Sequence, residues 1–94
     1  MLHHIIVKWK ERPADPQPMY REIEQLFRQT LTLPGVHSVE LILNVVDRPN
    51  RYDLMIRICM EPDALPVSAA CEAQHRWKDE YGHLIEKKAI FDCE

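Results

Sequence analysis

YDLMIRICM, residues 52–60, is the clearest structural signal in the chain. Apolar side chains stand at every second position, and Asp53, Met55, Arg57 and Cys59 stand between them. A period of two is typical of a β-strand that buries one face and leaves the other free. We therefore predict a strand here and look for its neighbours in the rest of the chain.

Two more segments show the same alternation, at 3–10 and 36–45, and the last residues, 88–94, are expected to form a short closing strand. Two others carry apolar residues at the three- and four-residue spacing of amphipathic helices, from about 18 to 33 and from 67 to about 87. Pro34 and Gly35 end the first helix, and the second is open to a break near Gln74. The order βαββαβ predicts an α+β fold with a ferredoxin-like antiparallel sheet, formed by one domain over residues 1–94.

Composition restricts the function. The chain has 94 residues, 46% of them apolar and 29% charged, which is typical of a small folded domain that gains stability by associating. The net charge of −3 and the lack of Lys/Arg clusters argue against nucleic acid as a partner. No apolar run is long enough for a membrane span, and the first residues do not resemble a signal peptide, so we expect a cytoplasmic protein.

The cysteines are also consistent with a cytoplasmic protein. The three cysteines are an odd number without CxxC spacing, so they predict neither a disulfide framework nor a zinc cluster. We expect all three to be small buried apolar residues.

Both faces of the predicted sheet carry apolar side chains. We assign Val7, Trp9, Leu41, Leu54, Ile56 and Ile58 to the face under the helices, and Ile6, Ile42, Met55, Cys59 and Ile90 to the opposite face. A sheet face in contact with water does not normally hold so many apolar groups. The sequence therefore predicts a homodimer in which two sheets pack face to face.

Four motifs, in order, resemble the stress-responsive A/B barrel (Dabb) family: HHIIVKWK, LPGVHSVELILN, RYDLMIRI and IFDCE. The resemblance covers nearly the whole chain and implies a dimeric α/β barrel, in agreement with the sheet-face argument. Most bacterial members have no assigned reaction. A polyketide cyclase of related fold uses two histidines, which fall on His3 and His75 here, but its HPAH motif reads EAQH and its tyrosine falls on Ala69.

The candidate catalytic residues are His3 and His75. His3 shares the odd-numbered positions of its strand with Ile5, Val7 and Trp9, so we place its side chain under the helices. An imidazole there needs a partner or a cavity, so His3 is either a structural histidine or a pocket residue. His75 lies on the solvated side of a continuous helix, but a helix that restarts near Gln74 would place it in the first turn as a base. Val7, Trp9, Trp77 and Tyr81 are expected in the core, where they would also line any ligand pocket.

Two functions are favoured, and a third, a cofactorless monooxygenase like those of a sister dimeric-barrel family, fits the fold but has no sequence support of its own. The first is a dimeric A/B barrel protein without assigned reaction, which binds a small apolar or aromatic ligand between the second helix and the sheet. The second is a cofactor-independent cyclase, lyase or isomerase in which His75 is the base and His3 polarises a carbonyl. His75, Asp79 and His83 are spaced to hold a metal weakly, but a charged surface explains them better, and we predict no metal and no cofactor.

Overall fold

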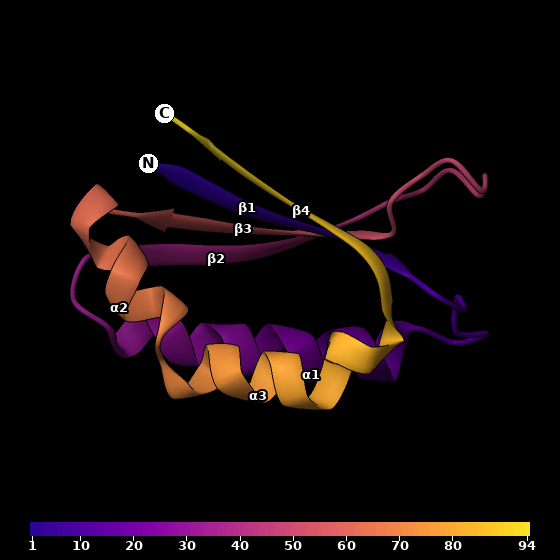
Figure 1. Ribbon diagram of the computed structural model, residues 1–94, viewed down its shortest axis with the longest axis horizontal. Coiled ribbons are helices and arrows are strands. Elements are labelled where there is room, and N and C mark those ends of the chain that lie inside the picture. The colour runs from indigo at the N-terminus through magenta and orange to yellow at the C-terminus, as the bar shows by residue number, and fades with distance from the viewer.

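The computed structural model describes all 94 residues, and it has the predicted ferredoxin-like fold. The four strands are β1 (Leu2–Trp9), β2 (Val36–Leu43), β3 (Leu54–Met60) and β4 (Ile85–Cys93). They form one antiparallel sheet in the order β2-β3-β1-β4, so β1 lies between β3 and β4 as predicted. The helices lie together on one side of this sheet (Figure 1).

Helix α1 (Gln17–Arg28) begins with prolines in and before its first turn and ends in a 3-10 turn, η1 (Gln29–Thr32). Proline suits a first turn because its missing N–H has no intrahelical partner there. Gly35 then turns the chain into β2 with a φ of 83°, in the left-handed region that favours glycine.

The second helical region is divided into more pieces than the sequence predicted. A short 3-10 turn, η2 (Pro62–Ala64), leads into α2 (Leu65–Ala69), and α3 (Glu72–Tyr81) follows after Cys71 adopts an extended backbone. The break therefore comes at 70–71, a few residues before Gln74. The 3-10 turn η3 (Gly82–Leu84) ends the region, so the predicted extension to Lys87 is wrong and Ile85 begins β4.

The core lies between the sheet and the helices. Its aromatic centre is Trp77, which packs edge-on against Phe27 at 5.2 Å and against Trp9 at 6.3 Å between ring centroids. Tyr81 lies 5.4 Å from the Trp77 ring. These contacts join β1, α1 and α3 into a single apolar core of 17 buried residues.

The register corrects one face assignment. Ile90 pairs directly with Ile5, so its side chain lies on the helix-covered face and not on the free face. A shift of one residue in register moves every side chain of a strand to the other face. The free face carries Phe91 and Ala89 from β4 instead, opposite His4 and Ile6.

The three cysteines are free, and each is partly exposed, so the prediction that they are buried is wrong. Cys59 and Cys93 both pair with Leu2 from opposite sides, so a strand separates them, as the predicted topology requires. No helix of the protein has the length and apolar character needed to cross a membrane.

Candidate functional site

A cavity of about 280 Å³ lies between the sheet and the helices α2 and α3, at the end of the sheet where β1 begins. The sheet supplies a histidine, two isoleucines and a lysine, and the helices supply a mixture of apolar and polar groups. The lining residues are His3, Ile5, Leu65, Ser68, Ala69, Gln74, Trp77, Lys78, Lys88 and Ile90. We call this cavity the His3 pocket.

His3 is buried on the helix-covered face, as its parity predicted. Its Nδ1 lies 2.5 Å from Oδ1 of Asp92, the residue directly opposite on β4. An ionised carboxylate only accepts hydrogen bonds, so Nδ1–H donates to Asp92, and in the neutral ring Nε2 carries the lone pair. Every fully buried polar side-chain atom of the protein has a hydrogen-bond partner. Because Nε2 of His3 makes no hydrogen bond in the chain, it is not fully buried. Nε2 is therefore open to a ligand, and in the neutral ring it can accept a proton.

The helical wall of the His3 pocket comes from one face of α3. Gln74, Trp77 and Lys78 are spaced i, i+3 and i+4, which places them on the same side of a helix. His75 is one residue, or about 100° of rotation, beyond Gln74, and its side chain is exposed. The structure therefore does not bring His75 and His3 together in this pocket, although His75 does lie in the first turn of α3.

The four residues predicted to line a ligand pocket do not share one. Val7 is fully buried, and Trp9, Trp77 and Tyr81 pack against one another in the core. Only Trp77 reaches the His3 pocket, because large aromatic side chains on the covered faces fill the space between helix and sheet. Tyr81 donates a hydrogen bond to Glu22 at 3.0 Å, and burial, followed by this contact, raises its pKa to about 12.

Sequence reasoning missed Asp92, Gln74 and both pocket lysines. Asp92 had a detectable signal, because it lies two residues from Ile90 on an antiparallel neighbour of β1, but its face depends on a register that alternation alone does not give. Lys78 and Lys88 are exposed and make no ion pair in the chain. They give the mouth of the pocket a positive charge.

The structure gives no support to a metal site formed by His75, Asp79 and His83. Asp79 and His83 are exposed as predicted for a wet face, and His83 lies in η3 rather than on the helix that carries His75. No three His, Cys, Asp or Glu side chains are grouped so that they could hold a metal ion.

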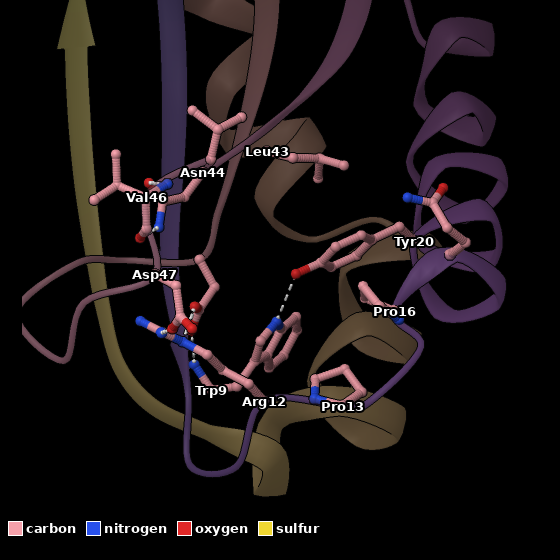
Figure 2. Close-up of a pocket in the computed structure, with 12 residues that line it drawn as sticks. Trp9, Arg12, Pro13, Pro16, Tyr20, Leu43, Asn44, Val46 and Asp47 are labelled. Carbon is pink, nitrogen blue, oxygen red and sulfur yellow. Dashed lines mark hydrogen bonds and ion pairs between the residues drawn. The ribbon is translucent and has the colours of Figure 1, made fainter.

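A second cavity, of about 470 Å³, lies at the opposite end of β1. It is an open groove bordered by the loop after β1, the first turn of α1 and the loop between β2 and β3 (Figure 2). Trp9, Tyr20, Arg12 and Asp53 lie at its base. We call this cavity the Trp9 groove.

Comparison with known proteins identifies related folds. No family model matches the chain, and no curated protein does. A protein from Arabidopsis thaliana superimposes with a TM-score of 0.75 at 13% identity, over 99% of this chain and 92% of the other. A dimeric protein of unknown function from Bacteroides fragilis gives the same score and identity over 99% and 93%. These likenesses show a shared ferredoxin-like fold.

A third structure bears on the resemblance found in the sequence. It is described as a Dabb family protein with a ferredoxin-like fold from Mesorhizobium loti, and it superimposes with a TM-score of 0.67 at 11% identity over 99% of this chain and 93% of its own. Its fold is the one that the sequence motifs predicted. At this identity the agreement concerns the fold and leaves the activity to be argued from the site.

Proposed function

We propose that the protein is a homodimeric small-molecule-binding domain of the stress-responsive A/B barrel type, with its ligand in the His3 pocket. The observation that carries the proposal is the cavity itself. It combines an apolar lining, a histidine oriented by a carboxylate and two unpaired lysines at one place between helix and sheet. Apolar pockets with a few convergent polar groups are the usual form of small-molecule sites.

The free face of the sheet supports the dimer. Its central row runs across all four strands, and the register makes its members Ala89, Ile6, Met55 and Ile42. In the next row Phe91 is 60% exposed, although it is a large aromatic residue. If a second copy covers the central row and Phe91, their apolar surface is removed from water. The Bacteroides fragilis protein, which shares this fold, is dimeric, and this supports a dimer here.

Met55→Lys tests the dimer. Met55 lies in the middle of the central row of the free face, and its side chain is already only partly exposed in the isolated monomer. We expect sedimentation velocity to show a dimer for the native protein and a monomer for this variant, since a lysine there would be buried without a partner. Val67→Lys is the control, since Val67 is 53% exposed on α2, away from the free face. A native monomer, or a dimer unchanged by Met55→Lys, contradicts the proposed interface.

The charge of the His3 pocket indicates the ligand class. Five lining residues are apolar, while Lys78 and Lys88 are free to pair with an anion. Asp92 does not line the pocket, and its carboxylate is already hydrogen-bonded to Nδ1 of His3. We therefore expect a small aromatic or apolar molecule with an anionic group, for which benzoate is a simple probe.

Ala69→Phe tests this ligand site by filling the cavity. Ala69 lines the pocket and is exposed, so the added ring does not enter the core. Benzoate should move the NMR resonance of the Trp77 indole N–H saturably in the native protein and not in this variant. Ala70→Phe is the control, since Ala70 is also exposed but does not line the pocket. Equal binding by both variants would place the ligand elsewhere.

The His3–Asp92 pair supports a second candidate, a cofactor-independent acid/base enzyme. His3 Nε2 would take a proton from a carbon next to a substrate carbonyl, and Asp92 would stabilise the resulting imidazolium. The same nitrogen would then return the proton to another position of the substrate, so no cofactor is consumed. In this form His3 is the base, and His75 contributes no group to the pocket.

Hydrogen–deuterium exchange at the α-carbon of benzoylacetate tests this candidate, because that probe combines an aromatic anion with an acidic carbon. We expect His3→Gln to lower the protein-dependent exchange rate by about a hundredfold, within the usual range for a general base. His75→Gln is the matched control and should leave the rate unchanged. If His75→Gln removes exchange and His3→Gln does not, the base is His75, as the family resemblance implies.

A further inference from the structure

The Trp9 groove, with a volume of about 470 Å³, is not used by the proposed function. It lies at the far end of β1 from His3 and shares no lining residue with the His3 pocket. Its walls come from loops that are distant in sequence, residues 11–16 on one side and residues 44–53 on the other (Figure 2). A ligand bound in the groove would therefore not contact any residue that lines the His3 pocket.

The base of the groove is held rigidly by charged hydrogen bonds. Asp53, which is 7% exposed, accepts from the backbone N–H of Trp9 at 2.9 Å and from Nε of Arg12 at 2.7 Å. Arg12 also donates to Asp47 at 2.5 Å and to the carbonyl of Arg48 at 2.7 Å. The two loops are thus joined before any ligand arrives, which lowers the entropic cost of binding.

Tyr20 offers the groove a hydrogen-bond donor. Its hydroxyl accepts from the indole N–H of Trp9 at 3.1 Å, and its own proton has no acceptor in the chain. Figure 2 shows the hydroxyl of Tyr20 directed from α1 into the space between the two loops. Burial raises the pKa of Tyr20, so the hydroxyl keeps this proton throughout the neutral range.

The remaining lining is mainly apolar and at least partly exposed, with Gln17 and Asn44 as its polar members. Val45 and Val46 are 93% and 40% exposed beside the groove, and Leu43 precedes them at the end of β2. The charged groups of the lining are one arginine and two aspartates, so they sum to a net negative charge. An anion is therefore disfavoured, in contrast to the His3 pocket with its two free lysines.

We propose that the Trp9 groove binds a neutral aromatic molecule bearing a carbonyl or similar acceptor, with its ring beside Trp9 and its oxygen on the hydroxyl of Tyr20. The apolar side chains of the β2–β3 loop would cover the exposed side of the ring. This site is independent of the function proposed for the His3 pocket, and each can fail without the other.

The two tryptophans allow both sites to be followed in one NMR experiment, because Trp9 lines the groove and Trp77 lines the His3 pocket. Acetophenone should move the Trp9 indole N–H resonance saturably, at roughly millimolar concentration for so small a ligand. Benzoate, with a similar ring but a negative charge, should act on Trp77 and not on Trp9. Equal or tighter binding of benzoate at Trp9 would overturn the charge argument.

Tyr20→Phe tests the donor directly. Loss of one hydrogen bond should weaken acetophenone binding about tenfold. Tyr81→Phe is the matched control, since Tyr81 is another buried tyrosine with a hydrogen-bonded hydroxyl outside the groove. Tyr20→Phe also removes the acceptor of the Trp9 N–H and so identifies the Trp9 resonance. Unchanged affinity in Tyr20→Phe, or no saturable Trp9 shift in the native protein, overturns the proposal.

A second pair of variants keeps the test decisive if Tyr20→Phe does not fold. Val46→Asp changes an exposed wall of the groove, and Val67→Asp makes the same change at an exposed site outside it. Only the first should abolish acetophenone binding. Trp9 also borders a hollow beside Met19 and His83. Because Val46 and Tyr20 line the groove and not that hollow, a Trp9 shift that survives in both of their variants would assign acetophenone to the hollow and overturn the proposal.

Discussion

Arg12 binds two carboxylates of very different burial, and this difference sets the cost of removing each. Asp53→Ala leaves the buried Trp9 N–H without an acceptor, which costs about 1–3 kcal/mol. It also breaks the contact with Arg12, whose side chain is 34% exposed, and this adds up to about 1 kcal/mol because water can replace the lost partner. We expect Asp53→Ala to lower the free energy of unfolding by about 1–4 kcal/mol.

Asp47→Ala removes a partner from the same guanidinium group, but the Asp47 side chain is 96% exposed. Exposed ion pairs contribute little, so we expect a loss below about 1 kcal/mol. Urea unfolding at one fixed protein concentration measures both values, since the stability of a dimer depends on concentration. Equal losses for the two variants would refute the argument that burial of Asp53 sets the energy of this network.

Two further predictions concern Gly35 and Tyr81. Gly35→Ala should lower the free energy of unfolding by about 1–2 kcal/mol, because φ is 83° and the new Cβ would lie 3.1 Å from Cβ of Ala64; Gly82→Ala, with nothing within 4 Å, should be neutral or slightly stabilising. The pKa of Tyr81 is raised from 10.0 to about 12. Its contribution to stability is therefore complete below pH 10.0 and lost as the pH rises through about 12, and urea unfolding of Tyr81→Phe should show a flatter alkaline profile.

The sequence predicted the elements and topology because its alternation is strong. Strands that bury one face repeat apolar residues every second position, and β3 shows this without interruption. The segment that became β4 reads IEKKAIFDC, in which charged and apolar residues do not alternate cleanly. Its register, and therefore the face of Ile90, came from pairing with β1 and was not visible in the segment itself.

The candidate site was predictable only in part. His3 followed from strand parity, whereas the direction of His75 depended on where α3 begins, a boundary that local pattern does not give. Asp53 occupied an ordinary polar position in an alternating strand, and only the folded chain shows that Arg12 and the Trp9 N–H meet there. The Trp9 groove arises from loops 30 or more residues apart, whose meeting no local motif encodes.

A crystal structure of the protein grown with benzoate tests the central claim most directly. The account predicts two copies packed through the free faces of their sheets, with the carboxylate of benzoate beside Lys78 or Lys88 and its ring in the His3 pocket. Nε2 of His3 should face the ligand while Nδ1 stays bound to Asp92. Benzoate outside this pocket, or copies that meet through their helices, would contradict the account.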